Sequence, residues 1–278
     1  MRWACVDCGI EHDAERASRV ARGGDTCLPG ELDVLSDATR RVWGLIRDAI
    51  PDGAYLAGGT GLAVHLQHRE SDDLDFFLEL AVDLEELAKA LGERGAVKIA
   101  TLTHDSLNCY FEGTKLQFLG TRDAQRLEPT VLIDGVRVAG VGDILAMKLL
   151  AVAQRVPPEV KDYIDLWAIE TIGHRGLEEG LALVVERYPT AERESVPQQA
   201  LRALTYFDDI QDQPLPRFTG TGISLAGLQQ YWTRRVAEVV RHLDTGGTQG
   251  GKSPESGLRS SGGTTRRTEQ KKGVRPPH

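Results

Sequence analysis

The sequence predicts an α/β (α+β) fold, a mixed sheet with flanking helices followed by a helical C-terminal region. Three observations support this prediction. A short apolar strand, a glycine-rich turn, an amphipathic helix and a second strand follow one another within residues 54–77. Short β-prone segments separated by tight turns continue to residue 119. From residue 141 onward, apolar residues recur at helical spacing.

The individual elements follow from apolar spacing and from breaker residues. A helix is expected over Asp83–Arg94. The strands that follow should be antiparallel because their turns are short, and they are predicted near 97–102, 107–111 and 115–119, with a short one near Val131. The helical repeat then predicts helices over 141–155, 160–171, 177–187, 197–207 and 225–243. Pro157 and Pro158 should end the first of these and start the second.

Composition divides the chain into four regions. Residues 1–33 form a poorly defined N-terminal extension, residues 34–140 the α/β core, and residues 141–244 the helical region. Residues 245–278 are mostly Gly, Ser, Thr and charged residues, which cannot offset the entropy of ordering, so a disordered basic tail is expected. Its seven Lys and Arg against two Glu are typical of tails that steer nucleic acid, although a solvated tail without a partner is the simpler explanation.

Length and composition predict a soluble protein with a substantial core. The 278 residues are 41% hydrophobic and carry a net charge of −8, which suits one or two domains. The chain has no run of eighteen or more apolar residues and no signal-like N-terminus. We therefore expect a cytoplasmic protein with no membrane partner. Four cysteines agree with a reducing compartment.

Cysteines near the N-terminus raise the question of a zinc site. Cys5, Cys8 and His12 lie in the segment CVDCGIEH, and Cys27 follows. A Cys-x-x-Cys-Gly turn is half of a zinc knuckle, but a second Cys-x-x-Cys is missing. Zinc binding and a plain extension both stay open. Cys109, on a predicted strand, is expected in the core.

The turn between the first strand and its helix is suited to phosphate binding. Gly58, Gly59 and Thr60 form this turn. Two glycines let backbone N–H groups approach a polyphosphate, and the helix that follows adds the positive end of its dipole. We predict that these three residues hold the phosphates of a nucleotide.

The second strand carries a pair of acids suited to a metal ion. Asp73 and Asp75 are two residues apart, so in a strand both side chains point to the same face, while Leu74 and Phe76 point into the core. Paired carboxylates suit Mg²⁺, which completes its coordination shell with water and substrate phosphates. The predicted phosphate-binding turn and the predicted metal ligands together have the layout of a nucleotide-transfer site.

The segment GGTGLAVHLQHRESDDLDFF resembles the AbiEii/AbiGii-type toxins of the nucleotidyltransferase superfamily. Their signature reads roughly Gly-Gly-Thr-Ala-Leu, then Arg-x-Ser-x-Asp-Leu-Asp-Phe, a lysine on a helix, and an Arg/Lys-Asp-x-x-Asp-Leu helix. The resemblance covers roughly residues 34–172. Besides the glycine turn, the matching residues are Arg69, Ser71, Asp73, Leu74, Asp75, Phe76, Lys148, Lys161, Asp162, Asp165 and Leu166.

This resemblance implies a nucleotidyltransferase-type fold and a Mg²⁺-dependent reaction. A nucleoside monophosphate would pass from a nucleoside triphosphate (NTP) to an acceptor hydroxyl, which the resemblance implies to be on a tRNA-like RNA. The protein would act as the toxin of a toxin–antitoxin or phage-defence system, and a cognate antitoxin would be its partner. Lys148 would contact the phosphates, as would Arg69 and Ser71. A later aspartate would serve the catalytic centre, with Asp162 favoured over Asp165.

Simpler explanations of these helical residues exist. Lys148 lies on the flank of an amphipathic helix and can be a solvated charge. Lys161 and Asp165 are four residues apart and can form an ordinary surface ion pair.

One departure from related polymerase-like enzymes bears on activity. Those enzymes place a third carboxylate on a neighbouring strand. In this chain the best-placed strand is the segment TKLQFLG, and its central polar residue is Gln117. An amide oxygen can ligate a cation but takes no proton at neutral pH. Asp162 or Asp165 would then act as the base, with Glu112 and Asp123 as lesser candidates. The alternative functions are a small-molecule, aminoglycoside-like nucleotidyltransferase and a degenerate, non-catalytic nucleotide-binding protein.

Overall fold

The computed structural model describes residues 3–4, 11–12, 31–121, 124–189 and 195–246. It divides into two compact units, Met1–Val240 and Arg241–His278. In the second unit the described residues are the end of the last helix. At the start of the chain, strands β1 (Trp3–Ala4) and β2 (Glu11–His12) pair antiparallel.

Two predictions fall largely outside the described residues. Cys5, Cys8 and Cys27 are not among them, and His12 is described only as part of β2, so zinc binding and a plain extension stay open alternatives. Nearly all of the basic tail is also outside them. The division at residue 140 stays a prediction as well, because both of its sides belong to the unit Met1–Val240.

A seven-stranded mixed sheet forms one half of the first unit, in the order β5-β6-β7-β4-β3-β9-β8. Strands β5, β6 and β7 are antiparallel, as predicted, whereas β4 pairs with β7 and β3 with β9 in parallel. The predicted mixed sheet is therefore confirmed. The strands are β3 (Ala54–Ala57), β4 (Leu74–Leu78), β5 (Val97–Leu102), β6 (Ser106–Phe111), β7 (Thr114–Gly120), β8 (Val131–Ile133) and β9 (Val136–Val138).

The predicted strand near Val131 is one arm of a hairpin. Asp134 and Gly135 both have positive φ, at 42° and 81°, between β8 and β9. An Asp-Gly pair in this conformation makes a two-residue hairpin turn whose twist matches that of the strands. The second arm, β9, lies beside β3.

The helices agree closely with the predicted ranges. Helix α2 was not predicted, although Ser36 caps it by accepting a hydrogen bond from the Thr39 backbone N–H at 3.2 Å. Helix α8 ends earlier than expected, at Ala203. The helices are η1 (Glu31–Val34), α2 (Asp37–Ile46), η2 (Arg47–Ala49), α3 (Gly58–Leu66), α4 (Leu84–Gly92), α5 (Val141–Gln154), α6 (Val160–Thr171), α7 (Leu177–Arg187), α8 (Val196–Ala203) and α9 (Leu225–Gly246).

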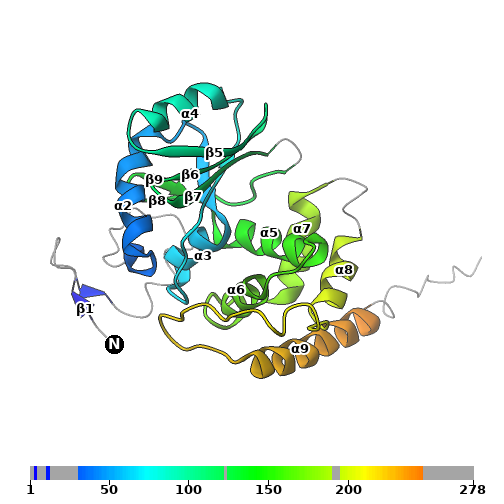
Figure 1. Cartoon of the computed structure of the whole chain (residues 1–278). Coiled ribbons are helices and arrows are strands. Elements are labelled where there is room, and N and C mark those ends of the chain that lie inside the picture. The colour runs from blue at the N-terminus through cyan, green and yellow to red at the C-terminus, as the bar shows by residue number, and fades with distance from the viewer. Residues whose placement is uncertain (1–2, 5–10, 13–30, 122–123, 190–194, 247–278) are drawn as a thin grey trace, which may run out of the picture. The chain divides into compact units, whose positions relative to one another are not determined.

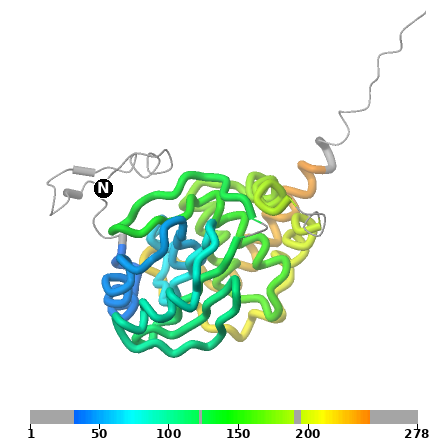
Figure 2. Tube along the Cα trace, turned by 90° about the horizontal axis from the view of Figure 1, so that it is seen from above, coloured from blue at the N-terminus to red at the C-terminus, as the bar shows by residue number. Residues whose placement is uncertain are grey.

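Each face of the sheet contributes to a different core. Leu74 and Phe76 are fully buried, as predicted, and pack in a cluster with residues of α2 and α4. Tyr55 and Ala57 point the other way and join a larger cluster built mainly from α5 to α9. Figure 1 shows α2 and α4 on the sheet half and α5 to α9 as the second half. In Figure 2 the blue and teal segments lie on one side and the yellow-green helices on the other.

Helix α9 is fixed to α6 by polar contacts as well as by packing. The Trp232 indole N–H donates to the Tyr163 carbonyl at 3.2 Å, and the Arg235 Nε donates to Glu170 Oε1 at 2.7 Å.

Cys109 is buried in the sheet core, as predicted. None of the helices in the described part of the chain combines the length and hydropathy that a membrane span requires.

Candidate active site

Two glycines allow the turn after β3 to pack directly against charged side chains. Helix α3 begins at Gly58, whose φ is +64°. A Cβ at Gly58 would stand 2.5 Å from Asp75 Oδ2, and one at Gly59 would stand 2.5 Å from Arg69 Nη2. Such distances are too short for a carbon, so a side chain at either position would force Asp75 or Arg69 to move, and the positive φ of Gly58 favours glycine there as well. The predicted phosphate turn and the predicted metal ligand are therefore neighbours.

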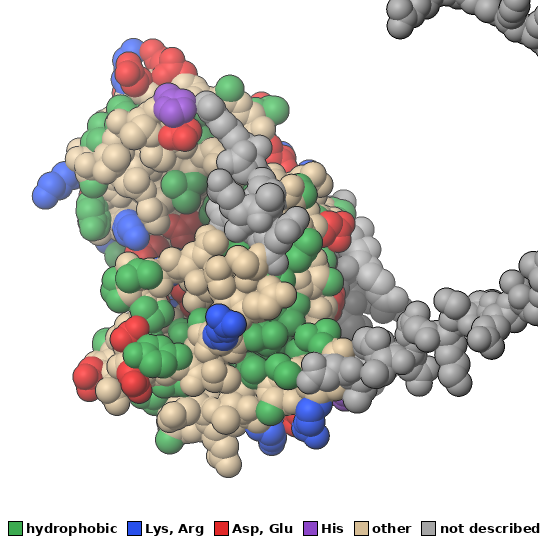
Figure 3. Space-filling view, turned by 90° about the vertical axis from the view of Figure 1, so that its right-hand side faces the viewer, with side chains coloured by type: hydrophobic (Ala, Val, Ile, Leu, Met, Phe, Trp, Pro, Cys, Tyr) green, Lys and Arg blue, Asp and Glu red, His purple; other side chains and the backbone are tan. Residues whose placement is uncertain are grey.

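The acid pair sits at the start of β4. Asp73 directly precedes the strand, and Asp75 pairs in register with Ala57 of β3. Asp75 Oδ1 is buried and has no hydrogen-bond partner in the described part of the chain. Burial raises the pKa of Asp75, and the neighbouring Asp73 carboxylate raises it further. Figure 3 shows a hollow between the sheet half and the helical half, with acidic side chains at its floor.

Hydroxyl groups fix the chain just before these acids. Thr60 is almost fully buried, donates a hydrogen bond to the Asp73 carbonyl, and hydrogen-bonds with the Ser71 hydroxyl at 2.7 Å. The Thr39 hydroxyl donates to the Asp72 carbonyl at 3.0 Å. The Thr60 and Ser71 side chains are thus engaged within the protein. A phosphate above the turn would meet backbone N–H groups.

Asp165 lies at the centre of a buried cationic cluster. Arg69 donates to its two carboxylate oxygens from Nε at 2.7 Å and from Nη2 at 2.9 Å. Lys148 Nζ is 2.6 Å from Oδ2, and His68 Nε2 is 2.9 Å from Oδ1. Burial alone would raise the pKa of Asp165, but Arg69, Lys148 and His68 hold it well below its usual range. The surface pair with Lys161 is therefore the wrong explanation of this aspartate.

Lys148 joins Asp165 to Asp162. Its Nζ donates to Asp162 Oδ1 at 2.8 Å, and Asp162 Oδ2 is 2.9 Å from Arg155 Nη1. The lysine is 7% exposed, so it is not a solvated charge. Burial lowers its pKa, but the two aspartates outweigh burial and raise it, so the lysine stays protonated. Its charge also lowers the pKa of Asp75.

The strand beside Asp75 carries an amide. Gln117 of β7 pairs in register with Asp75, and its Nε2 donates to Asn108 Oδ1 on β6. Glu112 accepts a hydrogen bond from the Ala96 backbone N–H at 2.6 Å, and Asp123 is outside the described residues. Within the described ranges, no group of three or more His, Cys, Asp or Glu side chains is placed to hold a metal ion.

Sequence reasoning missed three residues that touch this site. His68 contacts Asp165, Arg155 contacts Asp162, and Lys115 Nζ is 3.9 Å from Asp73 Oδ2. His68 and Arg155 lie in irregular segments, so no periodicity marks them. Lys115 could have been found, because strand alternation places it on the same face as Gln117.

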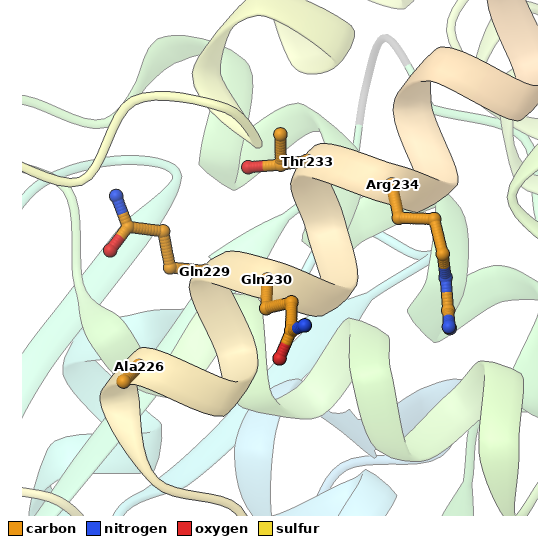
Figure 4. Close-up of a pocket in the computed structure, with 5 residues that line it drawn as sticks. All are labelled: Ala226, Gln229, Gln230, Thr233 and Arg234. Carbon is orange, nitrogen blue, oxygen red and sulfur yellow. The ribbon is translucent and has the colours of Figure 1, made fainter.

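Another hollow on the surface is separate from the acid pair. It lies along α9, and all of its labelled side chains come from that helix (Figure 4). Asp73 and Asp75 are not among its lining residues, which are Ala226, Gln229, Gln230, Thr233 and Arg234.

Comparison with known proteins identifies the family. The profile of the family described as "Nucleotidyl transferase AbiEii toxin, Type IV TA system" matches residues 43–254. The protein aq_aa25 of Aquifex aeolicus (strain VF5), described as uncharacterized, is 32% identical over 162 residues, which are 57% of this chain and 76% of that protein.

Solved structures with low sequence identity are also similar. A candidate nucleotidyltransferase from H. pylori is 16% identical, with 76% of this chain and 98% of that chain covered and a TM-score of 0.45. The antibiotic-resistance factor ANT(2'')-Ia is 15% identical, with 53% and 87% covered and a TM-score of 0.40. The family match spans the glycine turn, the acid pair and the Lys148–Asp165 cluster, and this chain belongs to the AbiEii family of nucleotidyl transferases.

Proposed function

We propose that this chain transfers a nucleoside monophosphate from an NTP to an acceptor hydroxyl with the help of Mg²⁺. The contact between the Gly58 backbone and the Asp75 carboxylate is the observation that carries the proposal. It puts the start of a helix, where backbone N–H groups can receive phosphate, beside a carboxylate with one buried, unpartnered oxygen.

The acid pair fits a hard divalent cation. Asp73 and Asp75 would hold Mg²⁺ through carboxylate oxygens, with water and triphosphate oxygens completing the shell. The orphaned Asp75 Oδ1 supports this assignment, because a buried carboxylate oxygen is otherwise costly to leave unpaired. When bound, the ion would neutralise charge on the α-phosphate and on the departing pyrophosphate.

The remaining residues of the site would bind the triphosphate or hold the glycine turn in position. Backbone N–H groups of Gly58, Gly59 and Thr60 would receive the phosphates, and the protonated Lys148 would balance their charge. Arg69, which packs against Gly59 and forms an ion pair with Asp165, would hold the turn in place.

The pKa of Asp165 bears on which of the two later aspartates could act as the base. Asp165 is bound to three cationic or donor groups, and its low pKa makes it a poor proton acceptor. We therefore assign Asp165 a positioning role. Asp162, which Lys148 and Arg155 bind, is our proposed proton acceptor on the strength of the family resemblance.

The biological role follows the family description. That description names a toxin of a type IV toxin–antitoxin system, which supports a toxin role and a cognate antitoxin partner for this chain. We propose a tRNA-like RNA as the acceptor. Gln117 beside Asp75 instead favours the second candidate, a nucleotide-binding protein without transfer activity.

Label transfer separates these functions. The full chain is incubated with total cellular RNA, Mg²⁺ and each α-labelled NTP in turn, and labelled RNA is measured on a gel. Asp73→Asn and Asp75→Asn are expected to abolish labelling, while Asp48→Asn, an exposed aspartate outside the site, should leave it intact. Equal labelling by both acid variants and the control would overturn the assignment, and nucleotide binding without labelling by the unmodified chain would favour the second candidate.

A further inference from the structure

A row of three side chains crosses the sheet beside the acid pair. Lys98 of β5 pairs in register with Tyr110 of β6, and Tyr110 pairs with Lys115 of β7. Residues paired across neighbouring strands point to the same face, so the tyrosine stands between two lysines. The two lysines are two strands apart, which is about 10 Å. We call Lys98, Tyr110 and Lys115 the Lys-Tyr-Lys row.

This row lies on the face that carries the acids and ends at them. Lys115 is two residues before Gln117, the register partner of Asp75, so all three share a face. Lys115 Nζ is 3.9 Å from Asp73 Oδ2. Tyr110 is 46% exposed, and Lys98 is exposed as well. The row therefore offers an open aromatic ring and two cations that extend across the sheet from the predicted metal site, with Lys115 at its near end.

The row and the phosphate turn lie on opposite sides of the acid pair. In the sheet order, β7, β6 and β5 extend from one side of β4, and β3, which leads into the Gly58 turn, lies on the other. In the proposed reaction the acceptor oxygen bonds to the α-phosphorus as the bond to the pyrophosphate oxygen breaks, and the hydroxyl loses its proton. The attacking and leaving oxygens must be in line. With the triphosphate over the turn, we expect the acceptor to approach from the opposite side of the acid pair, where the row lies.

We propose that the Lys-Tyr-Lys row binds a single-stranded segment of a nucleic-acid acceptor next to its reacting hydroxyl. A base would stack on Tyr110, while Lys98 and Lys115 contact the flanking phosphates. An aromatic side chain within a positive groove is the arrangement that proteins use for single strands. This inference rests on the proposed function for its direction of approach, but its binding test needs no catalysis.

Binding of a short, fluorescein-labelled, single-stranded oligoribonucleotide to the full chain tests the row by fluorescence anisotropy. Tyr110→Ala should weaken binding by roughly 5- to 100-fold, because a stacked base contributes on that order. Tyr110→Phe and Tyr110→Trp keep an aromatic face and should bind like the unmodified chain. Tyr206→Ala removes a similarly exposed tyrosine elsewhere and serves as the matched control.

Salt dependence tests the lysines. Lys98→Gln should reduce the slope of log affinity against log salt by roughly 0.7, the value for one phosphate contact on a single strand. Lys89→Gln makes the same charge change on α4, within a surface pair to Glu86, and should leave the slope unaltered.

Four outcomes would contradict RNA binding by the Lys-Tyr-Lys row. The first is unaltered RNA binding by Tyr110→Ala, and the second is an equal loss of RNA binding in Tyr206→Ala. The third is weak RNA binding by Tyr110→Phe and Tyr110→Trp. The fourth is weakened NTP binding by Tyr110→Ala with normal RNA binding, which would assign Tyr110 to the nucleotide base. Failure of the proposed function looks different. In that case the unmodified chain would transfer no label, while RNA binding would still depend on Tyr110.

Discussion

The Gly58 backbone lies directly against the Asp75 carboxylate, so that a Cβ at residue 58 would stand 2.5 Å from Oδ2. Gly58 is the first residue of α3 and directly follows β3, and Asp75 lies near the start of β4; the two strands pair antiparallel with Ala57 opposite Asp75. This contact joins the phosphate turn to the acid pair in a single structural unit.

Gly58→Ala should damage the site by displacing the turn from Asp75. The substitution combines a left-handed backbone angle with a clash against the half-buried Asp75 carboxylate, so the free energy of unfolding should fall by about 1–3 kcal/mol. NTP binding should weaken more than this stability loss explains. Urea denaturation and a binding titration measure the two effects.

Gly44→Ala is the matched control for this substitution. Gly44 lies in α2, where an added Cβ meets no atom within 4 Å. Alanine is the better helix former, so stability should rise by about 0.5–1 kcal/mol and NTP binding should not change. Equal NTP binding by Gly58→Ala and Gly44→Ala would argue against the role of the turn.

Asp75→Asn should stabilise the metal-free protein at neutral pH. The folded-state pKa of Asp75 is raised by burial and by Asp73, so the folded chain holds this proton more tightly than the unfolded chain does. The ionised group therefore opposes folding once the pH exceeds the unfolded value of about 3.9, and asparagine removes that penalty.

Thermal denaturation with and without Mg²⁺ measures the effect of Asp75→Asn. The Tm of the unmodified chain should rise on adding Mg²⁺, and that of the variant should start higher and respond less. A variant with a lower starting Tm and a full Mg²⁺ response would contradict this prediction.

Several parts of the site could be predicted from sequence because their chemistry is local. The turn and the acid pair lie within one strand–helix–strand unit, and strand alternation fixed the directions of Asp73, Leu74 and Phe76. Helix α6 was predicted with the bounds that it has, because its apolar repeat is uninterrupted.

Other parts depend on tertiary contacts that no local pattern marks. Arg69 and Asp165 are 96 residues apart, and their bidentate contact replaces the local pair that the spacing of Lys161 and Asp165 favoured. The Lys-Tyr-Lys row depends on the register of three strands. The cap of α2 by Ser36, in contrast, was a local signal that could have been used.

Asp165→Asn should be strongly destabilising. It removes the charge that two buried cations, Arg69 and Lys148, share, and leaving a buried charge without its partner typically costs about 3–5 kcal/mol. Lys161→Gln, on the exposed side of the same helix, should change stability by less than about 0.5 kcal/mol. Urea denaturation of the two variants tests the cluster, and similar small losses in both would show that it contributes little.

Acid should unfold the unmodified chain partly through Asp165. Its folded-state pKa lies well below the unfolded value of about 3.9, so its stabilising contribution is complete above that pH. This contribution should fall as the pH drops below about 4, toward the lowered pKa. The stability difference between the unmodified chain and Asp165→Asn, measured by denaturation at a series of pH values, should shrink in this range. A difference that stays constant down to acid unfolding would contradict the assignment.

The most direct test of the central claim is a titration with Mn²⁺, a spectroscopically visible substitute for Mg²⁺, in the presence of a non-hydrolysable NTP. Electron paramagnetic resonance measures the free ion. We predict tight, NTP-dependent Mn²⁺ binding by the unmodified chain and by Asp48→Asn, and its loss in Asp73→Asn and Asp75→Asn. Undiminished tight binding in both acid variants would contradict the claim that these two carboxylates hold the metal and the nucleotide together.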